Sequence, residues 1–519
     1  MADIVIIGGG VTGLSAGIHL LLDGGAAHRV TICEKHTVPG GNLTGWNRGG
    51  CHIDNCIHWL NGTNPTTKLY REWVRLGALE GVEIRKRDSL YTCRIGTDEL
   101  SLWRDAGRIE RAMLWYSPHD KREIHRLFRA VRTLQALSGL SGSDSEASSR
   151  SLSGLAGLMS YATLTTGELA ERFQHPLVRQ FLTAICDTSF SALAQLTIMA
   201  QFCGGNADLP VGGSAAMAER IAERFRSLGG TLRLGSHVES VELKCCSNGR
   251  RAVGVNVRQG GQNLRLPADY VIATADPATI CGKILDVPLP APLVRLYKAQ
   301  PPRRFSAVHA AFVLPSERIN FSDELSLPFP VREAVCPHGT SVLLREFTHE
   351  PDFAPPGYTV VQVMTLCNEE QARHILTLSR PEYLAFKQDV ARVFTDILND
   401  ICPPAPGQDP ARLLDVWTPA TYRRFIGTEI GSFMSFIMTP QTVPHDSLAA
   451  IRERIRIGHP VGSVPDVENV LLAGQWLRVP GGLPIAAGEG QRAAEAARRF
   501  LRAQEPGRIH VRLAGAAQP

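Results

Sequence analysis

The 519-residue chain lacks any apolar run long enough to span a bilayer, and its formal net charge is only +5. A membrane-spanning helix needs about 20 consecutive apolar residues, so the sequence predicts none. A charge excess this small says little about partners, and nothing further supports nucleic-acid binding. The 12 cysteines show none of the paired spacing typical of zinc sites. We therefore predict neither a bound metal nor a nucleic-acid partner.

The chain carries one dense basic run at near-helical spacing: Lys121, Arg122, Arg126, Arg129 and Arg132. Such a run could meet anionic lipid headgroups, although a solvated helix face is the simpler interpretation. No secretory hydrophobic region precedes Asp3. We expect a cytoplasmic, reduced protein. The sequence leaves peripheral membrane contact and the oligomeric state open.

The chain opens on a pattern typical of dinucleotide binding. The β-branched run Asp3–Ile7 predicts a buried parallel strand and is followed by Gly8, Gly10 and Gly13. Gly8 permits a tight turn, and Gly10 lets the backbone approach a pyrophosphate. Gly13 lets the next helix pack close to the strand. The sequence therefore predicts a dinucleotide site within its first turn.

The helix that follows is expected from about Val11 to Leu22. Its first N–H groups, at Val11 and Thr12, would present partial positive charge to phosphates. The next expected strand ends at Glu34, where an acceptor for ribose hydroxyls is needed. A lone GxGxxG is weak evidence, but a strand, glycines, a helix, a strand and a carboxylate in one short unit are strong evidence.

The segment after Glu34 contains a second glycine pair, Gly40-Gly41. It resembles the pair of the FAD-dependent amine oxidase and phytoene desaturase superfamily, in which the backbone passes close to the cofactor. The resemblance implies that Lys35, Gly40, Gly41 and Asn42 contact FAD. Many desaturases and amine oxidases have Arg where this chain has Asn42. Asn42 therefore weakly favours the isomerase and saturase branches of the superfamily, which also lack that Arg.

Two later segments resemble the same superfamily. Val238 matches a valine placed against the adenine end of the cofactor. Near the C-terminus, a strand ends at Gly474 and a glycine turn opens a helix, whose N-terminus the family places near the pyrimidine side of the flavin. The residues implied there are Gly474, Gly482, Leu483, Pro484 and Ile485.

In pattern the chain most resembles the phytoene desaturase-like proteins, which include carotenoid desaturases, carotenoid isomerases and retinol saturases. The resemblance implies an α/β fold, with a discontinuous Rossmann-type FAD domain and an inserted α+β substrate domain. We assign residues 1–80, 205–290 and 462–510 to the FAD-binding domain. Residues 81–204 and 291–461 form the expected substrate-binding domain.

The resemblance implies hydride transfer between flavin N5 and a lipophilic isoprenoid or polyene substrate, with desaturation or saturation of C–C bonds. The alternatives are a redox-neutral double-bond isomerase, a flavin amine oxidase and a non-catalytic prenyl-binding protein. The sequence shows no second GxGxxG unit for NAD. We therefore expect an external electron acceptor or donor.

The family usually has Phe-Asp-x-Gly-x-His near residue 55. Asp54 and His58 match this pattern, whereas Cys56 replaces the Gly. His58 is a candidate to move a proton or orient the substrate, or is simply a packed histidine. Asp54 is a candidate to hold the loop or to hydrogen-bond the cofactor. One further set either lines a lipophilic tunnel or belongs to the core: Phe433, Met434, Phe436 and Met438.

Overall fold

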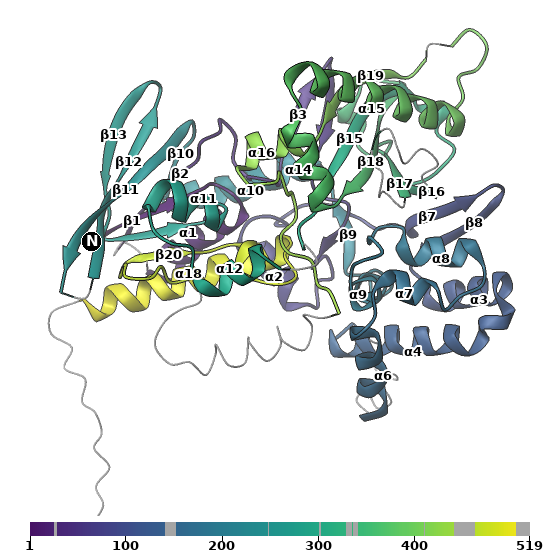
Figure 1. Cartoon of the computed structure of the whole chain (residues 1–519), viewed down its shortest axis with the longest axis horizontal. Helices are drawn as coiled ribbons and strands as arrows, with labels where there is room; N and C mark the ends of the chain where they lie inside the picture. The colour runs from purple at the N-terminus through teal and green to yellow at the C-terminus, as the bar shows by residue number, and fades with distance from the viewer. Residues whose placement is uncertain are drawn as a thin grey trace, which may run out of the picture.

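The computed structural model describes residues 1–24, 28–140, 152–247, 249–299, 303–328, 335, 341–408, 410–440 and 462–504, with side chains omitted at 152–156. Figure 1 shows two bodies side by side. One holds the N-terminus and a parallel sheet with its helices. The other holds a larger, mainly antiparallel sheet, with a group of helices below it in this view.

A five-stranded parallel sheet forms the first body, in the order β10-β2-β1-β14-β20. Its strands are β1 (Ala2–Ile7), β2 (His28–Cys33), β10 (Thr231–Arg233), β14 (Tyr270–Ala273) and β20 (Val470–Leu472). All four neighbouring pairs are parallel. β1 lies in the middle and is covered on both faces, which explains its unbroken β-branched composition. Three distant parts of the chain therefore share one sheet.

Alternate residues of β1 face two different layers. Ile4 and Ile6 share a hydrophobic cluster with four helices: α1 (Val11–Gly24), α2 (Lys68–Arg75), α10 (Gly213–Ser227) and α18 (Leu483–Ala503). Val5 and Ile7 pack toward an antiparallel sheet made of β11 (Ser236–Cys246), β12 (Gly249–Gln259) and β13 (Gln262–Pro267). The α/β fold expected from the sequence is confirmed, and α1 ends two residues later than Leu22.

The second body is built on a seven-stranded sheet, in the order β19-β15-β18-β17-β16-β7-β8. Its strands are β7 (Ser89–Ile95), β8 (Asp98–Trp103), β15 (Ser306–Pro315), β16 (Glu324–Pro328), β17 (Ser341–Glu346), β18 (Tyr358–Cys367) and β19 (Arg412–Trp417). The β16–β7 pair is parallel and the others are antiparallel. One face packs on α15 (Arg380–Ile401), whose apolar side joins the same cluster as Val308 and Phe312. The opposite face carries Arg345 and Gln362, which contact Asp54.

Helices dominate the part of the second body below the sheet. They are α3 (Ala106–Tyr116), α4 (Lys121–Leu137), α6 (Leu152–Ala162), α7 (Thr166–Ala170), α8 (Pro176–Thr183) and α9 (Ala192–Cys203). The remaining helices are α11 (Pro277–Thr279), α12 (Ala291–Tyr297), α14 (Glu369–Thr377) and α16 (Pro419–Ile426), and the small strands are β3 (Gly45–Arg48), β4 (Cys51–Asp54), β5 (Leu60–Asn61), β6 (Ile84–Arg85) and β9 (Ala207–Pro210). No described helix combines the length and apolar character needed to cross a membrane.

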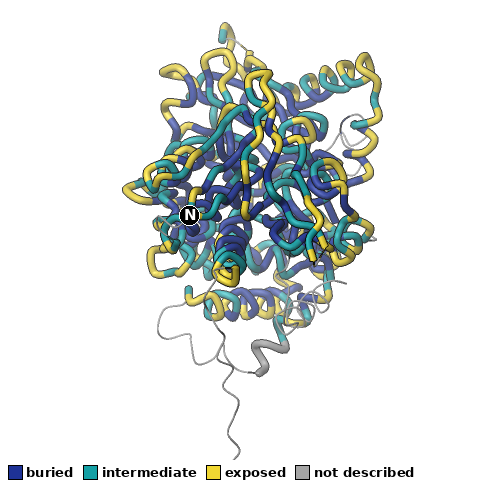
Figure 2. The backbone as a smooth tube through the Cα atoms, turned by 90° about the vertical axis from the view of Figure 1, so that its left-hand side faces the viewer, coloured by how far each residue is buried: buried dark blue, intermediate teal, exposed yellow. Residues whose placement is uncertain are grey.

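Burial follows these layers. Figure 2 shows buried segments gathered between them and exposed ones on the outer turns and helix faces. The parallel sheet draws its strands from residues 1–80, 205–290 and 462–510, and the seven-stranded sheet draws its strands from residues 81–204 and 291–461, whereas β6 pairs with β9 across this division. The division into an FAD-binding and a substrate-binding domain stays a prediction. Several segments of that division lie outside the described residues, the longest being residues 441–461.

Candidate active site

Four strands of the parallel sheet end at one edge. Gly8 follows β1, Glu34 follows β2, Thr274 follows β14, and Gly474 lies just beyond β20. The Thr274 hydroxyl donates to the Ile7 carbonyl over 2.9 Å. Open α/β sheets bind ligands outside the carboxyl ends of their strands. We therefore expect a dinucleotide to bind at this edge.

Two glycine segments lie against each other at this edge. Gly10 and Gly40 form a parallel β-bridge, and the Gly40 N–H donates to the Gly9 carbonyl over 2.8 Å. A Cβ added to Gly41 would lie 3.2 Å from the Gly10 Cα, and Gly41 has a φ of +61°. Only glycine suits this geometry, which leaves bare backbone facing the edge.

Two helices begin at the same edge. A Cβ on Gly490 of α18 would lie 2.5 Å from the Thr12 carbonyl oxygen, and the Ser15 hydroxyl donates to the Ala487 carbonyl over 2.8 Å. α18 begins after Gly482 without a side-chain cap. The first N–H groups of α1 and α18 have no acceptor within their own helices. Both helix starts therefore suit an electron-rich ligand.

Glu34 is 5% exposed and is held by backbone donors. Its carboxylate accepts from the Gly9 N–H over 2.7 Å and from the His36 N–H over 2.9 Å. Lys35 points toward α16, where its Nζ donates to the Arg424 carbonyl over 3.3 Å. Val238 is buried in the cluster that holds Ile7, close to Glu34. Only the backbone of Lys35 is therefore available to contact a cofactor.

These features together fit an adenine dinucleotide. Bare glycine backbone, two helix starts and a carboxylate occupy one edge of the sheet, as phosphate and ribose binding require. The residues we propose as FAD contacts in this arrangement are Gly8, Gly10, Val11, Thr12, Gly13, Glu34, Lys35, Gly40, Gly41, Asn42, Val238, Gly474, Gly482, Leu483, Pro484 and Ile485.

Asn42 joins the second glycine pair to the other body. Its Nδ2 donates to the Phe433 carbonyl over 2.9 Å, and its Oδ1 accepts from Asn55 Nδ2 over 3.4 Å. The segment from 431 to 439 therefore lies beside the cofactor loop. This contact places Phe433 directly beside the second glycine pair.

Asp54 is 1% exposed and bonds protein groups. Its carboxylate accepts from the Ser214 N–H over 2.5 Å and from the Ser214 hydroxyl over 2.8 Å. Ser214 lies in the first turn of α10, where a carboxylate also meets the positive end of the helix dipole. The Asp54 carbonyl accepts from Gln362 of β18 over 2.6 Å. These contacts favour the loop-holding role for Asp54.

His58 lies against a buried carboxylate. Its Nδ1 is 2.8 Å from Oε1 of Glu324, which is fully buried on β16. Burial alone would raise the pKa of Glu324, but the charge and hydrogen bond of His58, with Arg345 and Arg87, outweigh it and hold this pKa below its usual range. An ionised carboxylate that orients a histidine is the arrangement of a positioned acid–base pair.

Residues of the seven-stranded sheet form two rows on the face opposite α15. One row runs across the strands through the polar residues Glu324, Arg345 and Gln362 and ends at Ala311. The other is offset by two residues on each strand and comprises Ser326, Leu343, Met364, His309 and Trp417. The sheet thus offers an ionic strip beside His58 and a largely apolar and aromatic strip next to it.

Sequence reasoning missed the polar network around His309. Its Nε2 lies 3.1 Å from the Tyr422 hydroxyl, which donates to Asn55 Oδ1 over 3.0 Å. The Trp417 ring stacks on His309 at 4.6 Å. Because Tyr422 has one proton and gives it to Asn55, Nε2 of His309 must donate and Nδ1 is left as an acceptor. A histidine within a β-run was the sole sequence signal.

Burial, followed by the charge of His58, lowers the pKa of His309 to about 3. The unfolded chain takes up this proton near pH 6.5, so His309 stabilises the fold fully above that pH and progressively less below it. We expect a loss on the order of 2 kcal/mol from pH 6.5 to pH 5. Urea unfolding at both pH values measures it.

His309→Gln is the matched variant for this experiment, and its unfolding free energy should fall less over the same interval. Burial and neighbouring arginines also lower the pKa of His349 to about 3. The unfolding free energy of the variant therefore keeps part of its dependence on pH. An unchanged pH dependence in His309→Gln would contradict the assignment.

An apolar wall continues from the second row. Phe433 is half-buried against a cluster of Ala307, Leu343 and Met364, and Met434 against a cluster of Cys186, Phe190, Phe305 and Ile437. We call these two clusters, with Phe433 and Met434, the apolar wall. Phe436, 1% exposed, instead packs on Trp476 and Tyr297. Phe433 and Met434 thus remain candidates to line a lipophilic tunnel, whereas Phe436 belongs to the core.

A family model described as flavin containing amine oxidoreductase matches residues 11–498. The chain belongs to this family. As a flavin amine oxidoreductase it is an FAD-dependent enzyme, and the FAD cofactor expected from the resemblance of Gly40-Gly41 and the later segments is confirmed.

Among curated flavin amine oxidoreductase relatives, prolycopene isomerase 2 of an Oncidium hybrid cultivar is 25% identical over 460 residues, covering 83% of this chain and 75% of the relative. Phytoene dehydrogenase of Streptomyces griseus is 32% identical over 107 residues, 21% of this chain and 19% of the relative. The resemblance to phytoene desaturase-like proteins is confirmed.

Solved structures share the fold. An oxidoreductase from Methanosarcina mazei has a TM-score of 0.58 at 14% identity, covering 95% of this chain and 100% of that chain. Cyclohexylamine oxidase from Brevibacterium oxydans has a TM-score of 0.55 at 19% identity, covering 96% and 99%.

Proposed function

We propose that this flavin amine oxidoreductase acts on an apolar isoprenoid or polyene substrate, forming or removing a C–C double bond. The observation that carries the proposal is the apolar wall, which begins at Phe433, the residue whose carbonyl receives the Asn42 amide. Bound FAD supplies hydride transfer at N5. The names of the two curated relatives, an isomerase and a dehydrogenase of carotenoid-type substrates, support the same substrate class.

The chain's own residues have distinct tasks in this proposal. Phe433, Met434 and Met364 bind the hydrocarbon and exclude water. His309 is kept neutral by its burial, which lowers its pKa, and by the charge of His58, so it adds no charge to the site. His58, oriented through Nδ1 by Glu324, holds or moves a proton at Nε2.

The purified protein tests the proposal directly. We expect a flavin absorption spectrum, and expect added polyene to change in mass by whole hydrogen pairs when an external electron acceptor or donor is supplied. A colourless protein that binds prenyl compounds would instead indicate a carrier. Oxidation of simple amines without any effect on polyenes would indicate an amine oxidase.

Redox-neutral isomerisation is the second candidate. It is favoured by the relative that covers 83% of the chain, a prolycopene isomerase, and by Asn42 in place of the usual Arg. Incubating the enzyme with a cis-polyene under dithionite separates the two. A product of equal mass and shifted retention time supports isomerisation, whereas a mass change supports saturation.

His58→Gln should lower kcat about 100-fold, because a positioned acid or base contributes at least this factor. Flavin content should remain near that of the unmodified enzyme, whereas thermal stability should fall because the buried Glu324 carboxylate loses a charged partner. His119→Gln, an exposed change of the same type, is the control. An unchanged kcat and pH profile in His58→Gln would mean that His58 is a packed histidine.

The location expected from the sequence, cytoplasmic with peripheral membrane contact left open, stays a prediction. So does the external electron acceptor or donor.

A further inference from the structure

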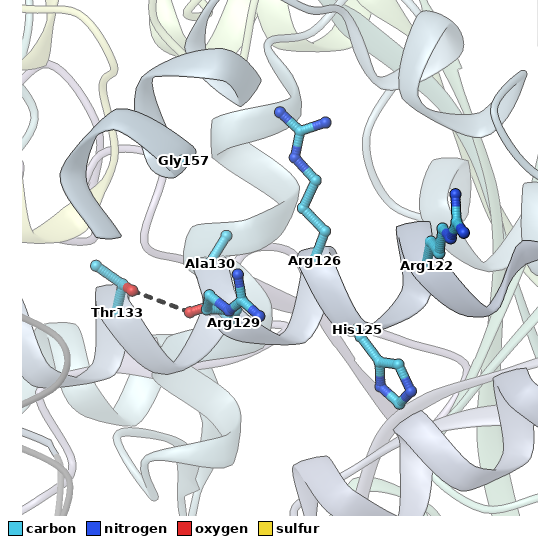
Figure 3. A pocket seen from close by; sticks show the side chains of 7 residues that line it. All are labelled: Arg122, His125, Arg126, Arg129, Ala130, Thr133 and Gly157. Carbon is cyan, nitrogen blue, oxygen red and sulfur yellow. Dashed lines mark hydrogen bonds between the residues drawn. The ribbon is translucent and has the colours of Figure 1, made fainter. Parts of the chain in front are cut away.

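A hollow of about 210 Å³ lies between α4 and α6, remote in sequence from the flavin-binding segments. Arg122, Arg126, Arg129 and Thr133 line it at helical positions i, i+4, i+7 and i+11, along one side of α4. Gly157 of α6 offers it bare backbone, and a Cβ there would meet nothing within 4 Å. Figure 3 shows Arg122 and Arg126 rising from the same side of the helix.

The structure divides the basic run into two sides. His125 also lines the hollow, but its ring leaves α4 on the side away from Arg126 (Figure 3) and lies 2.8 Å from Oε1 of Glu110 on α3. Arg132 also binds Glu110, over 2.5 Å. These two basic residues are therefore neutralised by an acid. The arginines of the hollow are arranged differently.

Arg122 and Arg129 form no ion pair with any residue that the structure describes. Arg126 donates to the Ser160 hydroxyl over 3.0 Å and is 3.9 Å from Glu123. Glu123 is itself bound more closely, 2.9 Å from Arg172. Like charges at i,i+3 and i,i+4 repel one another. The hollow thus gathers positive charge that its surroundings do not balance.

We propose that this hollow binds a phosphate group. Guanidinium groups present paired N–H donors that match phosphate oxygens, and several such forks on one anion are the usual solution for phosphate recognition. The Thr133 hydroxyl donates to the Arg129 carbonyl over 2.9 Å (Figure 3), so the arginines are the donors available to the anion. A helix face that only contacts solvent does not require three arginines around one hollow.

The phosphate has two possible sources, a lipid headgroup or a free phosphate compound. On the same two helices, Leu137 of α4 is 53% exposed and Met159 of α6 is 55% exposed. Apolar side chains beside a phosphate site suit a lipid surface, whereas a soluble phosphate needs none. The experiment has one arm for each source.

The test compares the full-length flavoprotein with the triple variant Arg122→Gln, Arg126→Gln, Arg129→Gln. One arm titrates inorganic phosphate and pyrophosphate against sodium chloride at equal ionic strength, with the melting temperature as readout. The other arm measures sedimentation with vesicles of phosphatidylcholine alone or with one-third phosphatidic acid. We expect binding in at least one arm, weakened tenfold or more in the triple variant and by raised salt.

A charge-matched control is Arg258→Gln, Arg392→Gln, Arg499→Gln, at three sites on other elements that are 57%, 60% and 83% exposed. It should bind like the unmodified protein. Equal loss in the control and the pocket variant would overturn the proposal, because net charge alone would then explain binding. Absence of binding in both arms would also overturn it. Neither readout depends on the proposed reaction.

Discussion

Replacing Gly13 by alanine should give a protein that contains no FAD and melts far below the unmodified enzyme. A Cβ at Gly13 would lie deep inside van der Waals contact with the Gly8 carbonyl oxygen and 3.3 Å from the Ile6 side chain. Both neighbours belong to the central strand or its turn, so neither can move without displacing the sheet. α1 must then shift away from the edge that the phosphates require.

The expected effect is at least a 1,000-fold loss in FAD affinity, equal to about 4 kcal/mol. Flavin absorbance of the purified protein and FAD titration of the apoprotein measure it. Gly282→Ala is the control, since the same change there meets nothing within 4 Å and the site is exposed. A Gly13→Ala protein that keeps full flavin content would show that α1 does not depend on this close approach.

Asp54→Ala should destabilise the protein by about 3–5 kcal/mol, a large part of the total stability of a typical domain. The change removes three acceptor contacts, to the Ser214 N–H, the Ser214 hydroxyl and the Cys56 N–H. It also leaves Arg345, 3.8 Å away and 6% exposed, with less compensating charge. Denaturant unfolding measures the loss.

The result separates the two roles considered for Asp54. A structural clamp predicts that stability falls and that flavin is lost only as the protein unfolds. A direct cofactor or catalytic contact predicts lower kcat or FAD affinity at unchanged stability, which would contradict our assignment. Asp98→Ala, at an exposed strand start, controls for loss of a carboxylate.

The cofactor edge could be predicted from the sequence because its constraints are local. Gly8, Gly10 and Gly13 lie within one turn, and Glu34 ends the strand next to them. Each residue is required by backbone geometry that neighbouring residues impose. The later segments at Val238 and Gly474 were placed by family resemblance, which supplied long-range information that the local pattern lacks.

The substrate side could not be predicted in the same way. Glu324 meets His58 only because β16 pairs with β17 in one register, and His309 meets Tyr422 only because β15 pairs with β19. A register shift of one residue would turn every one of these side chains to the other face. Nothing in the sequence near His58 indicates a partner 266 residues away.

The order of strands in the parallel sheet has a consequence for biosynthesis. β20 is made last, yet it covers the free edge of β14, and α18 packs onto α1, which is among the first helices to emerge. A nascent chain therefore carries an open strand edge and an uncovered apolar helix until its C-terminal residues leave the ribosome. Open strand edges promote pairing with other chains, so β14 is exposed to aggregation until β20 is added.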